Sequence, residues 1–152
     1  MKLLFIDLSP REYDTKTMIT EPLGGTQTAV AMLSLALADR GYNVTVINSV
    51  SAPRTVDGIN FLPSSSQVKL NDYDFIIPVS CALGEYIKKN GCEKPIILWT
   101  HHDANQPSVQ SLGFEREKSC YAGFAFVSNW QAMRYHEAFA IPRPYIQHRA
   151  MP

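Results

Sequence analysis

The sequence has no net charge, few cysteines and no long apolar run. Charged residues make up 18% of its 152 residues, and 14 basic side chains are balanced by 14 acidic ones. A neutral chain lacks the basic surface that attracts nucleic acid, and a hydrophobic content of 45% is too high for a disordered tail. We therefore expect a folded protein that does not bind nucleic acid and that binds its ligand through a local site.

The cysteines Cys81, Cys92 and Cys120 are odd in number and lack the C-x-x-C spacing of a structural zinc site or a redox motif. This pattern favours reduced, mostly buried thiols. The first apolar run is interrupted by Asp7 and Pro10, which makes it too short for a signal-peptide core or a membrane span. The sequence therefore predicts a cytoplasmic protein; membrane association is compatible with it but is not indicated by it.

Short apolar strands alternate with helices along the chain. We expect strands at 2–6, 43–47, 58–62, 75–79, 95–100 and 122–127, and helices at 26–40, 81–90, 109–119 and 130–140. The close succession of strand, helix and strand at the start implies a right-handed parallel crossover. The length is that of one domain, so the sequence predicts an α/β protein with a Rossmann-like, doubly wound, mostly parallel sheet flanked by helices.

Three local patterns lead to further predictions. Ser80 is expected to cap the helix at 81–90, and Ser128 or Asn129 the last helix. The mixed signs of residues 115–118 indicate a solvated helix face. The first helix is expected to pack on the sheet through a stripe with spacings of three and four, made of Ala29, Val30, Leu33, Ala36 and Leu37.

A double glycine stands between the first strand and the first helix. Gly24 and Gly25 have no Cβ, so the backbone can turn sharply and a ligand can come close. Thr26 and Thr28 suit a helix N-cap, and the amides of a first turn point forward with the positive end of the helix dipole. This layout favours a phosphate site, although it is neither a G-x-G-x-x-G fingerprint nor a Walker A loop. A tight connection without a ligand is the alternative.

The loop at 8–23 is polar and has no periodicity, and it follows the carboxyl end of the first strand. Ligands bind at that end of open α/β sheets, so we expect this loop to act as a substrate lid.

His101, His102 and Asp103 directly follow the strand at 95–100, and we expect them to lie level with the glycine turn. Histidine and aspartate both bind metals, but consecutive side chains of an extended segment point to opposite sides, so a shared ion is not favoured. The alternative is structural: one imidazole fills a packing position and the other bonds a loop carbonyl.

Several short motifs follow one another in a characteristic order. They are Pro-Leu-Gly-Gly at 22–25, Arg-Gly-Tyr-Asn-Val-Thr-Val at 40–46, Thr-His-His-Asp at 100–103, Phe-Val-Ser-Asn-Trp at 126–130 and Phe-Ala-Ile-Pro at 139–142. In this order they resemble the N-terminal domain of family 4 glycosyltransferases, which has a P-x-G-G turn, an amphipathic helix, R-G-H-x-V-x-V, a strand ending in His-Asp and a V-S-x-x corner. The resemblance spans nearly the whole chain. Tyr42 replaces the family's usual histidine, and Gln27 stands where an acidic residue is common.

The resemblance implies a GT-B architecture, in which two Rossmann-like domains face a cleft. It implies retaining transfer from a nucleotide-sugar, such as a UDP- or GDP-sugar, without an essential metal. Gly24 and Gly25, with Thr26 beside them, would contact the donor diphosphate, and His102, or else His101, would act at the donor sugar. The acceptor would be bound by the loop at 8–23 and by polar residues at the strand ends, namely Asp103, Asn105, Gln106 and Ser128.

The family's second domain, with its E-x7-E segment, has no counterpart before Pro152. The resemblance therefore implies that residues 1–152 form the acceptor-side domain, inactive by itself. Its partners would be a nucleotide-sugar, an acceptor that is a glycan, a lipid or a small molecule, and its own C-terminal domain. The alternative is a noncatalytic α/β module that binds a nucleotide, a small anion or a protein partner.

Overall fold

The computed structural model describes residues 1–142, and it divides into two compact units. The first unit covers Met1–Ile77, and the second begins at Pro78. Each unit is described by itself below.

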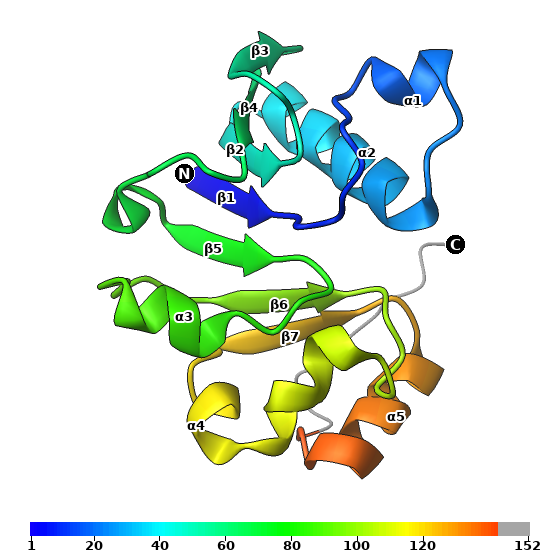
Figure 1. Ribbon diagram of the computed structural model, residues 1–152, viewed down its shortest axis with the longest axis vertical. Coiled ribbons are helices and arrows are strands. Elements are labelled where there is room, and N and C mark those ends of the chain that lie inside the picture. The colour runs from blue at the N-terminus through cyan, green and yellow to red at the C-terminus, as the bar shows by residue number, and fades with distance from the viewer. Residues whose placement is uncertain (143–152) are drawn as a thin grey trace. The chain divides into compact units, whose positions relative to one another are not determined.

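The first unit is built on a five-stranded sheet with the order β3-β4-β2-β1-β5 (Figure 1). Its strands are β1 (Lys2–Ile6), β2 (Asn43–Asn48), β3 (Arg54–Val56), β4 (Ile59–Pro63) and β5 (Phe75–Pro78). β1 pairs with β2 and β2 with β4 in parallel, whereas β3 pairs with β4 antiparallel. The prediction of an α/β fold with a mostly parallel sheet flanked by helices is therefore confirmed.

The strand order reverses at β1, which has β2 on one side and β5 on the other. Figure 1 shows β5 running in the same direction as β1. In open α/β sheets, ligands bind beyond the carboxyl ends of the strands at such a switch point. The loop that leaves β1 therefore starts at a position where ligands commonly bind.

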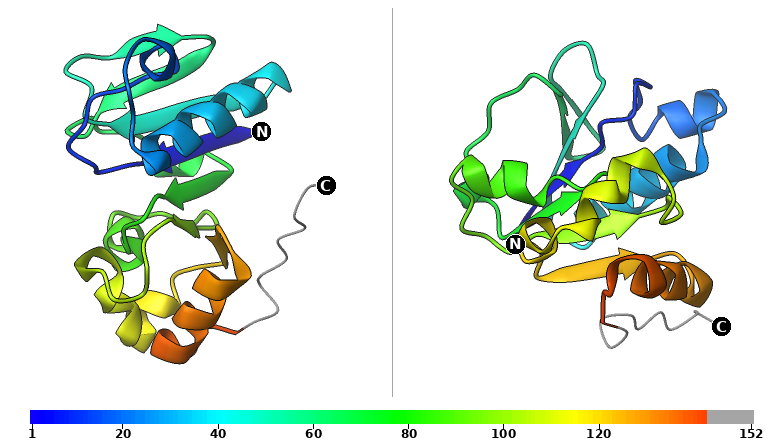
Figure 2. Two further views of the ribbon diagram at one scale, coloured as in Figure 1. Left: turned by 90° about the vertical axis from the view of Figure 1, so that its right-hand side faces the viewer. Right: turned by 60° about the horizontal axis from the view of Figure 1, so that its bottom comes forward.

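Helix α2 (Gly25–Asp39) packs on β2 and β4 through Val30, Ala31 and Ser34 (Figure 2). The predicted stripe is wrong in part, because Leu33 is 37% exposed and Ala36 is also exposed. No charged residue lies between Gly25 and Ala38, so apolar side chains surround most of the helix. Spacing alone could not show which face is buried.

A hairpin that the sequence analysis missed joins β3 and β4. Its turn residues, Asp57 and Gly58, have φ values of 51° and 76°. This is the Asp-Gly pair that two-residue hairpins favour, because both central residues need a positive φ. The dipeptide is visible in the sequence and could have predicted the hairpin.

The second unit contains the parallel strands β6 (Ile97–Thr100) and β7 (Gly123–Phe126). Its helices are α3 (Gly84–Lys89), the 3₁₀ helix η2 (Pro107–Gly113), α4 (Glu115–Lys118) and α5 (Asn129–Phe139). Two short helices of the first unit complete the list, α1 (Thr17–Thr20) and the 3₁₀ helix η1 (Leu70–Asp72). Figure 2 shows α5 beside β7. Their contact forms an apolar core with Leu98, Val109, Leu112, Phe126, Tyr135 and Phe139.

Two predicted helices of this unit differ from the structure. Helix α3 begins at Gly84, and its N-cap is Leu83, so the predicted cap at Ser80 is wrong. Ser80 has a φ of 54°, and its Oγ accepts a hydrogen bond from the amide of His101. The predicted helix at 109–119 is instead η2 followed by α4, because Phe114 between them has an extended backbone.

Glu117 in α4 also differs from its predicted solvated position. It is 3% exposed, and its carboxylate accepts hydrogen bonds from the amides of Gly84 and Glu85 and from the Tyr121 hydroxyl. The carboxylate thus caps α3, where the N-cap Leu83 has no polar side chain. The acidic group is stabilised in the interior by this helix end.

Among the residues that the structure describes, no helix has the length and the apolar character needed to cross a membrane.

The loop after β1 is anchored by buried polar side chains. Tyr13, which is fully buried, donates a hydrogen bond of 2.7 Å to Asp7, and Ser9 donates its amide to the same carboxylate. The side chain of Asn48 in β2 donates to the carbonyl of Tyr13. Burial, together with the Asp7 charge, raises the pKa of Tyr13. The first half of the loop is therefore fixed to the sheet.

We expect Tyr13→Phe to lower the free energy of unfolding by about 1 to 3 kcal/mol, because it leaves a buried Asp7 oxygen without its donor. Urea denaturation at neutral pH measures the change. Tyr42→Phe is the matched control: its ring is half-buried, and no hydrogen bond of its hydroxyl is recorded in residues 1–142. That variant should stay within about 0.5 kcal/mol of the wild type. Equal stability of the two variants would contradict the anchoring role of Tyr13.

Candidate functional site

The glycine turn forms the start of α2. Gly24 is the N-cap with φ −65° and ψ 160°, and Gly25 is the first helical residue. Neither glycine has a positive φ, so the backbone conformation alone does not require a glycine at either position. A Cβ on Gly24 would collide with the Gln27 side chain, whereas a Cβ on Gly25 would meet no described atom within 4 Å. Gly25 therefore leaves open space beside the helix start.

The predicted threonine cap is wrong. The N-cap is Gly24, which has no side chain, while Thr26 and Thr28 lie inside the first turn of α2. The first-turn amides therefore have no N-cap side chain to accept their hydrogen bonds. The positive end of the dipole of this 15-residue helix lies beside the open space at Gly25.

The predicted lid divides into two parts. The part up to Thr15 is held against the first unit, since Tyr13 and Thr15 are buried and the Thr15 hydroxyl donates a hydrogen bond to Asp57. The following turn, α1, has no buried residue, and its Ile19 is 79% exposed. The part of the loop around α1 therefore has the exposure that a moving lid needs.

In the second unit, His101 and His102 follow β6 directly and have different surroundings. The ring of His101 packs against Trp99, with 4.6 Å between the ring centroids. The Nδ1 atom of His102 lies 2.8 Å from the Ser108 hydroxyl in η2. The two rings therefore contact different elements, and Nε2 is the nitrogen of His102 left for a ligand.

The backbone of His102 is held by the core. Its carbonyl oxygen accepts hydrogen bonds from the Tyr135 hydroxyl at 2.8 Å and from the Gln131 amide at 2.9 Å. Its own amide donates to the Thr100 hydroxyl, which in turn lies 2.8 Å from the Tyr135 hydroxyl. Thr100, Gln131 and Tyr135 are all buried. The position of His102 is thus fixed by β6 and α5.

The predicted acceptor residues fall into two groups. Asp103 pairs with Arg134 at 3.3 Å, and Asn105 and Gln106 are exposed in the next turn. Ser128, in contrast, caps α5, and its hydroxyl accepts the Gln131 amide at 3.1 Å. The cap at Ser128 confirms the prediction for this helix. Ser128 therefore has a structural role as a helix cap. Asp103, Asn105 and Gln106 lie at the surface, close to His102 in the sequence.

Sequence reasoning missed the residues that position this segment: Ser108, Gln131, Arg134 and Tyr135. Arg134 and Asp103 are 31 residues apart, and no local pattern links them. Asp7 in the first unit was also missed, although the sequence gives a signal for it. It is a carboxylate directly after a buried strand, and the sequence analysis used it only to limit the apolar run.

Among the described residues, no group of three or more His, Cys, Asp and Glu side chains is arranged to hold a metal ion.

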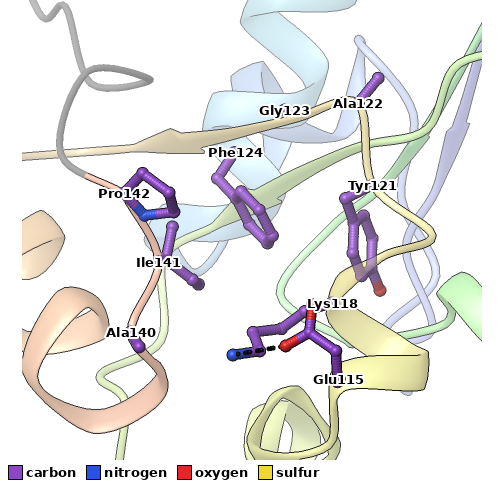
Figure 3. Close-up of a pocket in the computed structure, with 9 residues that line it drawn as sticks. All are labelled: Glu115, Lys118, Tyr121, Ala122, Gly123, Phe124, Ala140, Ile141 and Pro142. Carbon is purple, nitrogen blue, oxygen red and sulfur yellow. Dashed lines mark ion pairs between the residues drawn. The ribbon is translucent and has the colours of Figure 1, made fainter.

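A pocket of about 240 Å³ lies at the start of β7 (Figure 3). Its lining mixes apolar side chains, including Tyr121, Phe124 and Ile141, with polar groups. Its cation, Lys118, already binds Glu115 and the carbonyl of Phe139. None of the predicted site residues lines this pocket, because His102 follows the carboxyl end of β6 and the pocket adjoins the amino end of β7.

Comparison of the chain with models of known protein families and with curated protein sequences gives no match. The resemblance to family 4 glycosyltransferases therefore stays a prediction.

Tyr135 gives a test of how His102 is held. The pKa of Tyr135 is raised to about 12, chiefly by burial; the bond with Thr100 opposes the rise, and the nearby Asp103 charge adds to it. A tyrosine whose pKa is higher in the folded state contributes its full stabilisation at pH values below its ordinary pKa of 10.0. This contribution is lost as the pH rises from 10 toward 12.

We expect Tyr135→Phe to be less stable than the wild type by about 1 to 2 kcal/mol at pH 8, because the His102 carbonyl loses a donor. Between pH 10 and pH 11 the difference should shrink by about 1 kcal/mol, because only the wild type loses the contribution of Tyr135. Urea denaturation across this pH range measures both effects. A difference that stays constant with pH would contradict the assignment.

Proposed function

We propose that this chain is the acceptor-side domain of a retaining glycosyltransferase that uses a nucleotide-sugar donor. The observation that carries the proposal is the start of α2. An open glycine, Gly25, lies at a helix N-terminus without a side-chain cap, on the segment that follows the carboxyl end of β1. Backbone amides and the helix dipole at such a position suit a diphosphate.

The proposed role of Gly24 and Gly25 is to let the donor diphosphate approach the amides of the first turn, with Thr26 as a neighbouring contact. The leaving group of sugar transfer is this diphosphate, and fixed dipoles stabilise the charge that develops on it. The segment supplies dipoles that need no rearrangement, because α2 is a regular helix packed on the sheet.

The proposed role of His102 is to act at the donor sugar, with His101 as the second candidate. The transition state of transfer has oxocarbenium character, so positioning of polar groups near the reacting carbon matters. Ser108 holds Nδ1 of His102, and α5 holds its carbonyl. These contacts support a fixed imidazole whose Nε2 faces the ligand.

In this proposal the donor is a UDP- or GDP-sugar, no metal is essential, and a second α/β domain that carries E-x7-E grips the nucleotide. The acceptor is a glycan, a lipid or a small molecule. The alternative is a noncatalytic module that binds a nucleotide, a small anion or a protein. A coding sequence that continues past Pro152 into a domain with E-x7-E favours the transferase, and a stop codon there favours the module.

Gly25→Ala tests the diphosphate contact. We expect unchanged stability, because the added Cβ meets no neighbour and alanine suits a helix. The kcat/KM for the donor should fall about 10-fold to 100-fold, because the methyl group blocks a charge-assisted hydrogen bond. Gly113→Ala, at another open glycine, is the matched control and should leave the donor kinetics unchanged. Equal kinetics of the two variants would refute the contact.

His102→Ala tests the catalytic role. Full-length protein incubated with a panel of UDP- and GDP-sugars should consume one of them, and the variant should do so about 100-fold more slowly. His136→Gln is the control, since that imidazole bonds the carbonyl of Ile141 at the far end of α5. Consumption of no donor by the wild type would refute the transferase. An unchanged rate in the variant would refute the role of His102.

A further inference from the structure

Trp130 is a large aromatic ring at the surface of the second unit, and no predicted role accounts for it. It lies in the first turn of α5 and is 59% exposed. Tryptophan is on average highly buried, because burial of aromatic surface is strongly favourable. Its exposure next to the segment that carries His102 therefore calls for an occupant.

A cation and a carboxylate lie on one side of the ring. The guanidinium of Arg134 lies 5.9 Å from the centroid of the Trp130 ring, and its Nε pairs with Oδ1 of Asp103 at 3.3 Å. Asp103 is in turn adjacent to His102. The three side chains of Trp130, Arg134 and Asp103, which we call the Trp130 platform, thus connect α5 to the loop after β6.

The platform has unused hydrogen-bonding capacity. The recorded bonds of Asp103 use Oδ1, which accepts from Arg134 and from the amide of Ala104. In the described part of the chain no hydrogen bond to Oδ2 is recorded, and the Arg134 fork has five N–H donors, of which the recorded contacts use few. A carboxylate acceptor and a guanidinium donor side by side match neighbouring hydroxyl groups, each of which both donates and accepts.

We infer that the Trp130 platform binds a pyranose ring, and that the acceptor of the proposed transferase is therefore a carbohydrate. One face of a pyranose carries C–H groups that pack on the electron-rich face of an indole ring. Its hydroxyls lie at the rim, where they reach Asp103 and Arg134. The inference rests on the proposed function for naming this sugar the acceptor, but binding itself does not depend on it.

The charge around the ring favours a sugar over a membrane. An interfacial helix combines an apolar face with several basic residues, whereas α5 carries Arg134 and Glu137 as its charged side chains, and these lie 3.9 Å apart. Among residues 1–142, the exposed large apolar residues closest to it in the sequence are Val127 and Met133. A single platform with a polar border fits a small polyhydroxylated ring.

The test is binding of methyl glucoside, methyl galactoside, methyl mannoside, N-acetylglucosamine and maltose to the chain. Trp99→Phe leaves Trp130 as the sole tryptophan, so its fluorescence reports on the platform. We expect saturable quenching by at least one of these sugars, with saturation transfer to its ring protons in NMR. Sorbitol, which has similar hydroxyls but no ring, should not bind.

Variants separate the ring from its surroundings, with saturation-transfer NMR as the readout for those that lack the indole. Trp130→Ala should weaken binding about tenfold and Trp130→Phe about threefold or less, since phenylalanine keeps an aromatic face. Asp103→Asn should weaken binding, because it removes the negative charge from the side chain that accepts hydrogen bonds from the sugar hydroxyls. Met133→Ala, an exposed apolar residue of the same helix, is the control and should bind like the parent.

Each outcome decides the inference. Failure of all five sugars to bind, or equal binding by Trp130→Ala, would overturn it, as would a fluorescence change with lipid vesicles and none with sugars. Donor consumption by the full-length protein, measured separately, distinguishes the two proposals. Sugar binding without donor consumption would support the platform as a sugar site and refute the proposed transferase. Donor consumption without sugar binding would refute only the sugar site at the platform.

Discussion

The carbonyl oxygen of His102 accepts hydrogen bonds from Tyr135 and Gln131, and the arrangement of the second unit depends on these contacts. They join the end of β6 to α5 through buried side chains, and the Thr100 hydroxyl bonds both the Tyr135 hydroxyl and the amide of His102. A loop that follows a strand is usually the most variable part of an α/β unit. Here the core determines its conformation, so His102 and Asp103 project from a rigid base, and such a base is what catalysis by positioning requires.

The strands could be predicted from the sequence where burial is complete. β1 and β2 are buried along almost their whole length because parallel strands are covered on both faces, and their bounds match the structure closely. Prediction failed where a tertiary contact overrides local pattern. Ser80 was expected to cap a helix, but its hydroxyl serves the amide of His101. Glu117 was expected in water, but it caps a helix that is distant in sequence. Neither contact leaves a local signal.

The candidate site was predictable in outline. Polar residues directly after a strand, such as His102 and Asp103, can be found in the sequence because the carboxyl ends of strands carry the ligand-binding loops. Their partners could not be found, because Ser108 and Arg134 come from other elements whose placement depends on packing. The glycine turn was expected to leave room for a ligand, and a Cβ on Gly25 would indeed meet no described atom within 4 Å, although neither glycine has a positive φ.

The central proposal is that the start of α2 binds the diphosphate of a nucleotide-sugar. An NMR titration of the full-length protein, labelled at glycine nitrogen, with UDP- and GDP-sugars tests it most directly. The account predicts that the amide of Gly25 shifts until it saturates with at least one donor, while the amide of Gly113 stays unchanged. No shift of Gly25 with any donor, or an equal shift of Gly113, would contradict the account.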